Sequence, residues 1–386
     1  MEKIRVLSIF GTRPEAVKMA PVVQKLALIP QIESHICVTA QHREMLDQVL
    51  HLFEVKPDID LNLMQANQGL ADLTANIFRA LDPILCDVNP NWILVQGDTT
   101  TVMATALCAY YHKIKVGHVE AGLRTDDKYA PFPEEINRRV AGVVADLHFA
   151  PTPHSRQNLL NEGVPDWRIK VTGNTVIDAL QQIVKFPMPA EIEKLLNSKN
   201  VLSGERMLIT ITAHRRECFG TPFENICQGL REIAEVYSNK VELVYPVHLN
   251  PNIQEPAHRI LDGISNITLL KPIEYLPLIH LLKHSKLVLT DSGGIQEEAT
   301  GLGVPTLVLR EVTERPEGVK AGVLKVVGTD SERIFQETRR LLENEDAYSS
   351  MAHAANPFGD GHAAERIVQA ILDYQEPEHS TSSDSN

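Results

Sequence analysis

Residues 286–298 read KLVLTDSGGIQEE, and this stretch decides how the rest of the chain is interpreted. A short apolar run ends in Asp291-Ser292-Gly293-Gly294 and passes directly into a helical pattern. Two glycines let a phosphate approach the backbone, and a helix N-terminus offers free N–H donors and the positive end of its dipole. Glu298 lies one turn into that helix, where it could accept hydrogen bonds from ribose hydroxyls. A plain strand-to-helix turn has the same pattern, so both interpretations stay open here.

The same unit of apolar run, polar turn and helix recurs along the chain. Strands that alternate with helices predict parallel sheets covered on both faces. The runs divide into two series of six, which favours two doubly wound halves over one oversized sheet. We expect a first domain over 1–173, a second over 174–361, a C-terminal helix (362–375) that packs back onto the first, and a disordered tail (376–386). The expected strands are 5–10, 35–39, 92–96, 115–119, 147–150 and 170–172, then 207–212, 241–247, 267–270, 286–290, 306–309 and 323–327.

Composition narrows the function classes. The chain has 386 residues, of which 43% are hydrophobic and 23% charged, as is typical of a folded protein. A net charge of −13 with no basic patch argues against nucleic acid or an anionic membrane as a partner. No apolar run has the length of a membrane span, and the first residues lack a signal-peptide pattern. The five cysteines are scattered without a C-x-x-C pair, which predicts reduced thiols in a cytoplasm.

Unusual polar residues follow the expected strands, where ligands of open α/β sheets bind. Thr12 and Glu15 have the spacing of a capping box, so Glu15 is interpreted as structural. Arg13 and Lys18 are cations near a helix N-terminus, where the helix dipole disfavours them. A bound anion would explain both, and solvated surface cations are the alternative.

Three acids follow strands of the first half, namely Asp98, Glu120 and Glu134. Clustered carboxylates suit acid/base catalysis, because burial and mutual repulsion can raise one pKa toward neutrality. Asp98 could instead cap a helix, and Glu134 could simply begin one. His214, in the run AHRRE, is the histidine best placed for an anion site or proton transfer.

Several common kinds of site have no matching pattern. His42, His118 and His248 lack metal-ligand spacing with His214, so we expect no metal. Without a G-x-G-x-x-G after the first strand or a P-loop, a tightly bound dinucleotide and P-loop ATP chemistry are disfavoured. Cys218 lies near His214 in sequence, but this spacing is not typical of a nucleophile.

From residue 5 to about residue 372 the chain resembles the bacterial non-hydrolysing UDP-N-acetylglucosamine 2-epimerases. The motifs that carry the resemblance are FGTRPEA (10–16), TAQHR (39–43), QGDTT (96–100), HVEAGLRT (118–125), PEE (133–135), TGNT (172–175), HRRE (214–217), DSGG (291–294) and TERPE (313–317). The resemblance implies a GT-B-like fold, a homodimer, no cofactor, and reversible conversion of UDP-N-acetylglucosamine to UDP-N-acetylmannosamine for surface polysaccharides.

The resemblance also implies roles for individual residues. Acid/base catalysis would fall to Asp98, Glu120, Glu134 and His214. UDP would be held by Arg13, Lys18, Ser292, Gly293, Gly294, Glu298 and Arg315. In some members a second UDP-N-acetylglucosamine acts as an activator at positions matching Gln41, Glu44, Arg215 and His248. Three positions depart from the usual pattern: Cys218 stands where Asn is common, some members carry Gln where this chain has Glu44, and Ile273, near the expected uracil contact, stands where a polar residue can occur.

The chemistry of the sugar favours one mechanism. The proton on carbon 2 has no adjacent carbonyl, so direct removal is very difficult. Loss of UDP to give 2-acetamidoglucal, followed by re-addition, avoids a redox cofactor. The alternatives are a GT-B glycosyltransferase, a hydrolysing epimerase and a catalytically silent sugar-nucleotide sensor.

Overall fold

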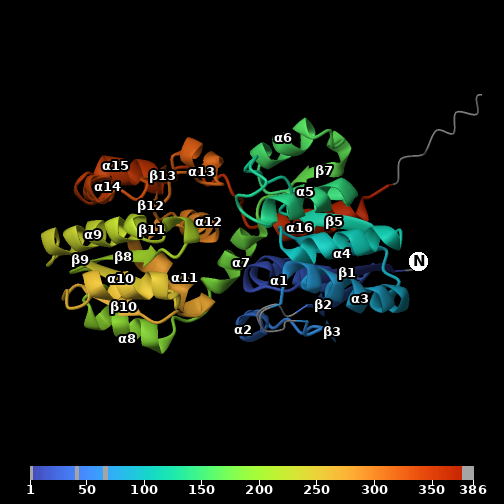
Figure 1. Cartoon of the computed structure of the whole chain (residues 1–386), viewed down its shortest axis with the longest axis horizontal. Coiled ribbons are helices and arrows are strands. Elements are labelled where there is room, and N and C mark those ends of the chain that lie inside the picture. Colours follow the sequence, from blue (N-terminus) through green and yellow to red (C-terminus); the bar gives the residue numbers. More distant parts are fainter. Residues whose placement is uncertain (1–2, 40–42, 64–67, 376–386) are drawn as a thin grey trace, which may run out of the picture.

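A computed structural model describes residues 3–39, 43–63 and 68–375, without the side chains of Arg43 and Glu44. Two α/β bodies lie side by side, with helix α7 (Thr175–Ile183) between them (Figure 1). Each body is built on one sheet whose neighbouring strands all run parallel. The predicted class, two doubly wound parallel sheets, is confirmed. The expected tail (376–386) lies outside the described residues.

The first sheet has the strand order β3-β2-β1-β4-β5-β6-β7. Its strands are β1 (Ile4–Phe10), β2 (Ile32–Val38), β3 (Ile59–Asp60), β4 (Trp92–Gln96), β5 (Lys115–Val119), β6 (Leu147–Ala150) and β7 (Ile169–Val171). Its helices are α1 (Arg13–Ala27), α2 (Arg43–Leu52), α3 (Leu70–Val88), α4 (Thr100–Tyr111), α5 (Glu134–Val144) and α6 (Pro153–Asn161), with a short 3₁₀ turn at Asp166–Arg168.

The second sheet has the order β10-β9-β8-β11-β12-β13, which repeats the winding of the first. Its strands are β8 (Met207–Thr212), β9 (Val241–Pro246), β10 (Ile267–Leu270), β11 (Ser285–Thr290), β12 (Thr306–Val308) and β13 (Leu324–Val326). Its helices are α8 (Ala190–Ser198), α9 (Thr221–Val236), α10 (Pro251–Leu261), α11 (Tyr275–His284), α12 (Gly293–Gly301), α13 (Pro316–Ala321), α14 (Ser331–Glu343) and α15 (Glu345–Ala352), with a 3₁₀ turn at Arg216–Cys218.

Successive residues of a strand point to opposite faces of the sheet, and in these strands the residues on both faces are apolar. In β1, Val6 packs into the core beneath α1, whereas Leu7 packs into the core beneath α3 and α4. In β8, Ile209 belongs to the core under α9, and Leu208 faces α8 and α11. Near-continuous apolar strands are what a doubly covered parallel sheet requires.

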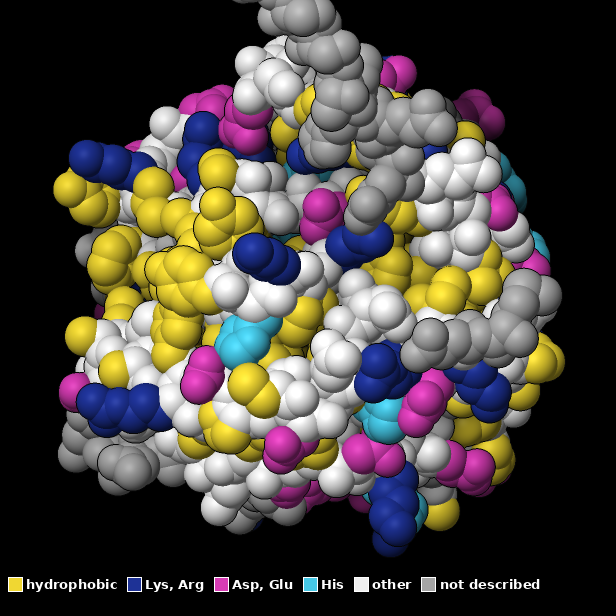
Figure 2. Space-filling model, turned by 90° about the vertical axis from the view of Figure 1, so that its right-hand side faces the viewer, with side chains coloured by type: hydrophobic (Ala, Val, Ile, Leu, Met, Phe, Trp, Pro, Cys, Tyr) yellow, Lys and Arg dark blue, Asp and Glu magenta, His cyan; other side chains and the backbone are white. Residues whose placement is uncertain are grey.

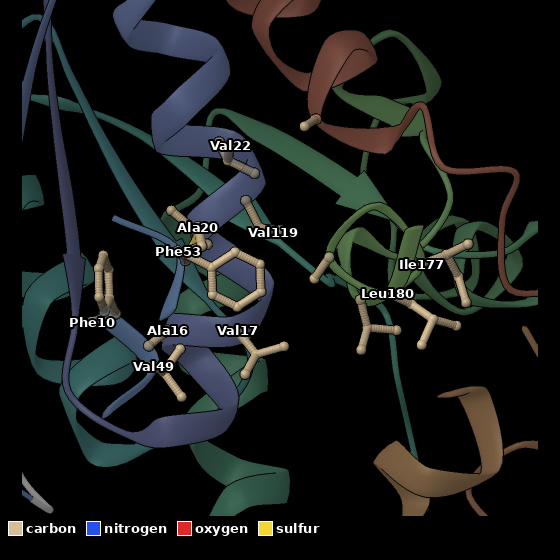
Figure 3. Close-up of a cluster of buried hydrophobic side chains, with 14 of the residues drawn as sticks. Phe10, Ala16, Val17, Ala20, Val22, Val49, Phe53, Val119, Ile177 and Leu180 are labelled. Atoms are coloured by element: carbon tan, nitrogen blue, oxygen red, sulfur yellow. The ribbon is translucent and has the colours of Figure 1, made fainter. Parts of the chain in front are cut away.

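Helix α7 joins the two bodies through apolar contacts. Ile177 and Leu180 of α7 belong to the same buried apolar cluster as Val17, Ala20 and Phe53 (Figure 3). The same two side chains contact α12 closely, because a side chain on Gly301 would meet Leu180 at 2.8 Å and Ile177 at 3.0 Å. The position of α12 relative to the first sheet is therefore set by direct packing.

The C-terminal helix α16 (Ala363–Leu372) lies against α1 and α7 of the first body (Figure 1). The carboxylate of Asp178, on α7, accepts hydrogen bonds from the backbone N–H groups of Ala363 and Ala364 at 3.2 and 2.9 Å. A carboxylate at the N-terminus of α16 interacts favourably with the positive end of the helix dipole. The chain thus crosses between the bodies twice, once through α7 and once before α16.

Five of the twelve expected strands match the structure residue for residue, and seven differ by one to three residues at their ends. The two-residue strand β3 was not expected, because its run is too short and too polar to show a pattern. Among the described residues, no helix combines the length and apolarity needed to cross a bilayer.

In each sheet, successive strands are added outward in one direction and then in the other. This change of direction falls between β1 and β4 in the first sheet and between β8 and β11 in the second. Loops after such strands diverge and leave a crevice, where ligands of this architecture bind. The segments that follow these strands therefore form the candidate site.

Candidate active site

Glu120 follows β5 directly and lies at the centre of the site. Its φ of 64° is in the left-handed region, which side-chain-bearing residues adopt at a cost. The residue is 8% exposed, and its carboxylate accepts hydrogen bonds from Lys18 Nζ at 2.6 and 2.7 Å and from Gln96. Strained backbone with a buried carboxylate is typical of a functional position.

Residues of the second body complete the surroundings of Glu120. Arg315 Nη2 lies 3.7 Å from Glu120 Oε1, and Arg315 Nε donates a hydrogen bond to Glu297. Asn174 Nδ2 donates to Glu120 Oε1 at 3.0 Å and to Glu297 Oε2 at 2.8 Å. Two cations, two carboxylates and the amides of Gln96 and Asn174 therefore form a buried network across the interface of the two bodies.

The network decides the charge of Glu120. Burial alone would raise its pKa, but the charges of Lys18 and Arg315 outweigh burial and lower the pKa. For Glu297, burial prevails over the same two cations, and its pKa is raised. Glu120 is thus held as a carboxylate, the form that can accept a proton.

Asp98 follows β4, and its surroundings raise its pKa, whereas those of Glu120 lower the pKa of that residue. Burial raises the pKa of Asp98 although Arg138 is paired with it, and the charges of Glu120 and Glu134 raise it further. Asn137 Nδ2 donates to the backbone carbonyl of Asp98 at 2.9 Å. Both partners lie on α5, so this helix fixes the position of Asp98.

Glu134 is the first residue of α5, as the sequence predicted. Its Oε2 is buried and has no hydrogen-bond partner among the described residues. A carboxylate oxygen left in this state is available to a ligand in the cleft.

Helix α12 begins at Gly293 with Ser292 as its N-cap, which confirms the predicted helix start. Apart from its chain neighbours and the backbone of its own helix, no heavy atom of the described residues lies within 4 Å of where a side chain on Gly294 would begin, and at Gly293 the nearest such atom is Arg315 Nη2 at 3.7 Å. Open space thus adjoins the free N–H groups of α12. An anion placed there would meet both the helix dipole and the guanidinium.

Glu298 is buried one turn further along α12. Burial raises its pKa to about 7, against the opposing effects of the Tyr275 hydroxyl and the Arg13 guanidinium. Arg13 and Tyr275 also line a cavity of about 410 Å³ between the two bodies. Arg13, Tyr275 and Glu298 therefore belong to one region beside the α12 N-terminus.

His214 follows β8 and is held by Asp291, at the end of β11. One carboxylate oxygen of Asp291 accepts from the backbone N–H groups of His214 and Arg215 at 2.6 and 2.7 Å, and the other lies 3.7 Å from His214 Nδ1. Burial lowers the pKa of His214, Asp291 opposes this, and His248 and Arg215 lower the pKa further. The result is a neutral imidazole near pH 7.

The residues expected at an activator site are only partly described. The exposed ring of His248 stacks on His214, with centroids 5.4 Å apart, and Arg215 is the next residue along the chain. Gln41 and the side chain of Glu44 lie outside the described residues. The structure therefore places Arg215 and His248 beside His214 and leaves the other half of this prediction open.

The remaining sequence predictions concern Glu15 and Cys218. Glu15 accepts from the backbone N–H groups of Gly11 and Thr12 at 2.9 and 2.7 Å, so the capping box is confirmed. Burial raises the pKa of the Cys218 thiol to about 12, which makes it a poor nucleophile. Among the residues that the structure describes, no three potential metal ligands come together.

Sequence reasoning did not single out Asn174, Gln96, Glu297 or Tyr275. Gln96 lies in the QGDTT motif and Asn174 in the TGNT motif, but each has the sequence pattern of an ordinary residue at the end of a strand. Glu297 reads as a helical glutamate beside Glu298. Their importance follows from contacts between segments that are far apart in the sequence.

Comparisons with known proteins agree over nearly the whole chain. A family model described as UDP-N-acetylglucosamine 2-epimerase matches residues 24–372. The chain is 54% identical over 374 residues to the UDP-N-acetylglucosamine 2-epimerase of Salmonella typhimurium, covering 96% of this chain and 99% of the relative. It is 53% identical over 370 residues to the enzyme of the same name from Escherichia coli K12, covering 95% and 98%. The crystal structure of UDP-GlcNAc 2-epimerase from Neisseria meningitidis bound to UDP-GlcNAc is similar with a TM-score of 0.88 and 47% identity, over 96% of this chain and 100% of that one.

Proposed function

Because the chain belongs to the UDP-N-acetylglucosamine 2-epimerase family and has its GT-B-like fold, we propose that it interconverts UDP-N-acetylglucosamine and UDP-N-acetylmannosamine by elimination and re-addition of UDP. The chain is an isomerase of the non-hydrolysing type. Its product would supply a precursor for surface polysaccharides. The observation that carries the mechanism is the buried carboxylate of Glu120, held charged between Lys18 and Arg315.

UDP would bind where cations and the α12 N-terminus meet. In this proposal Arg315, Lys18 and the N–H groups at Ser292, Gly293 and Gly294 hold the diphosphate, and Glu298 accepts from the ribose. Arg13 lines the adjoining cavity. The related enzyme from Neisseria meningitidis binds UDP-GlcNAc in its crystal structure, which supports the same ligand here.

The reaction begins with Glu120 as base. Its carboxylate takes the proton from carbon 2 while the bond between carbon 1 and the UDP oxygen breaks, and the electron pair leaves with UDP. Arg315, Arg13 and the neutral imidazole of His214 stabilise the charge that develops on the diphosphate. The products of this half-reaction are 2-acetamidoglucal and UDP, both retained in the cleft.

The return step needs a proton donor on the other face of the sugar. Asp98 is suited to this role because its pKa is raised, and the charge of nearby Glu134, whose Oε2 has no hydrogen-bond partner among the described residues, contributes to that rise. Addition of the acid proton to carbon 2 and of UDP to carbon 1 gives the epimer. Closure of the two bodies over the site would keep water from the glycal.

Two further parts of the proposal concern assembly and regulation. Figure 2 shows hydrophobic side chains gathered on the face of the first body that lies away from the second. Tyr110, Tyr111 and Val143, at the C-terminal ends of the adjacent helices α4 and α5, are 60%, 69% and 84% exposed. We assign this face to a homodimer contact, and light scattering of the Tyr111→Lys variant should show a monomer where the wild type is a dimer. A wild-type monomer would contradict it.

A second UDP-N-acetylglucosamine would bind as an activator beside Arg215 and His248. A cytoplasmic location is also part of the proposal, and the five free cysteines of the structure support it.

Incubation with a sugar nucleotide alone tests the proposed reaction. Purified chain and UDP-N-acetylglucosamine, followed by proton NMR, should give UDP-N-acetylmannosamine at equilibrium without an added acceptor or nicotinamide. Release of free N-acetylmannosamine would indicate a hydrolysing enzyme, and an unchanged substrate would contradict the proposal. The comparisons do not favour a glycosyltransferase, which would need an acceptor.

A further inference from the structure

Glu297 has contacts that the proposed roles of its neighbours do not explain. Its side chain is 1% exposed, and its two oxygens have different partners, Arg315 Nε on one and Asn174 Nδ2 on the other. The residue lies on α12, between the phosphate turn at Gly293 and Glu298. It is not among the described residues that line the cavity beside Arg13.

These contacts fix the direction of Arg315. Glu297 binds the guanidinium at Nε and leaves Nη2 to other partners. Nη2 lies 3.7 Å from Glu120 Oε1 and 3.7 Å from the point where a side chain on Gly293 would begin. One guanidinium nitrogen therefore lies between the carboxylate of the first body and the anion cradle of the second.

Helix α12 also holds the backbone that carries Arg315. Gln296 Oε1 accepts a hydrogen bond from Thr313 Oγ1 at 2.6 Å, and the same hydroxyl accepts from the Arg315 N–H at 3.1 Å. Neighbouring residues of α12 thus secure both the backbone and the side chain of Arg315.

Stability alone is a poor explanation for this arrangement. Burying two carboxylates and two cations costs desolvation that their mutual attraction often fails to recover. The cluster balances in charge, with Lys18 and Arg315 against Glu120 and Glu297. Removing only the Glu297 charge would leave both cations to pair with Glu120, and a carboxylate held by two cations is a weaker base.

We infer that Glu297, joined to Glu120 through the Asn174 amide, is a positioning residue that aims Arg315 at the leaving diphosphate and keeps it from pairing fully with Glu120. This inference rests on the proposed function, because it assumes that Glu120 transfers the proton and that Arg315 binds the diphosphate. It assigns to Glu297 an effect on turnover rather than on ligand affinity.

Glu297→Gln tests the inference through a split between turnover and binding. Misplacement of a reacting group by about 1 Å costs roughly 10²-fold, so kcat should fall by about that factor. The Kd of UDP, measured by calorimetry, should stay the same or decrease, because a negative charge near the diphosphate has been removed. Glu297→Asp restores the charge and should recover about tenfold of the lost kcat.

The control is another buried glutamate of the same body. Glu242, on β9, is fully buried and pairs with Lys199 at 2.9 Å and Arg206 at 3.2 Å, away from the cleft. Glu242→Gln should lower the melting temperature and leave kcat unchanged. Should Glu297→Gln not fold, Asn174→Ser keeps a residue able to cap α7, removes both amide donors, and should give the same split.

The outcomes separate this inference from the proposed function. A wild-type chain that does not epimerise would refute the proposed function, whatever the variants do. With an active wild type, a Glu297→Gln kcat within about threefold of normal would overturn the inference. So would a loss of UDP affinity in parallel with kcat, since that result describes a structural support of the binding site.

Discussion

The ends of β4 and β5 carry one carboxylate each, and their surroundings give them opposite properties. At the end of β5, Lys18 and Arg315 outweigh burial and lower the pKa of Glu120. At the end of β4, burial prevails over Arg138 and raises the pKa of Asp98. Neighbouring acids with pKa values pushed apart are suited to act as base and acid. The local cations, rather than the residue type, therefore assign the roles.

The largest effect is expected at the charged member of the pair. Glu120→Gln removes the base, and kcat should fall by roughly 10³-fold, within the range for general base catalysis. The Kd of UDP should not rise, because Lys18 and Arg315 keep their charges. Steady-state kinetics and calorimetry measure the two quantities. A variant that turns over normally but binds UDP poorly would show that Glu120 serves ligand binding and not proton transfer.

Replacing the other member should have a smaller but clear effect. Asp98→Asn keeps the shape and loses the transferable proton, and kcat should fall by about 10²-fold because Glu134 lies nearby as a partial substitute. Burial raises the pKa of Asp98, so the decline of kcat on the high-pH side that reports this acid should weaken in the variant. If that decline were unchanged in the variant, Asp98 would not be the acid.

Removing a cation beside Glu120 should raise its pKa, so that burial prevails there as it does at Asp98. Lys18 holds the pKa of Glu120 down, so in Lys18→Met this pKa rises, and the rising limb of kcat/KM shifts to higher pH by about one unit or more. The control is Lys25→Met on the same helix, since Lys25 pairs with Glu365 at the surface at 3.3 Å. A shift of the same size in both variants would show that the pairing with Glu120 is not its cause.

The smallest effect is expected for a carboxylate outside the cleft. Hydrogen bonds from Arg366 lower the pKa of exposed Asp360 to about 2. Because the folded pKa is below the unfolded value, its stabilisation is present above about pH 4 and is lost as pH falls through about 2. Asp360→Asn should cost less than about 1 kcal/mol at pH 7 and nothing near pH 2, with kcat unchanged. Denaturant titrations at both pH values test this, and an equal loss of stability at both would exclude the charge as its source.

The sequence predicts the fold better than it predicts the contacts within the site. Apolar runs such as 92–96 and 207–212 give their strands directly, because a doubly covered strand is apolar throughout. The Thr12–Glu15 cap is local and was predicted as well. Two helices, α7 and α8, lie between the two series of expected strands, on either side of Pro187-Met188-Pro189. These prolines do break the helical pattern, but only between the two helices.

The network around Glu120 could not be predicted in the same way. Asn174 reaches Glu297 across 123 positions of sequence, and Arg315 approaches Glu120 from the other body. No local spacing encodes such pairs, because they depend on how the two sheets are placed by α7. The direction of each pKa shift follows from these long-range contacts, so the sequence offered three acids without an order among them.

Epimerisation in deuterated water tests the elimination mechanism most directly. If Glu120 removes the carbon 2 proton and Asp98 returns one from the other face, the product must carry deuterium at carbon 2, which NMR or mass spectrometry detects. Product that keeps the original hydrogen at carbon 2 would contradict the mechanism, since it would mean that the proton never left for a group that exchanges with solvent.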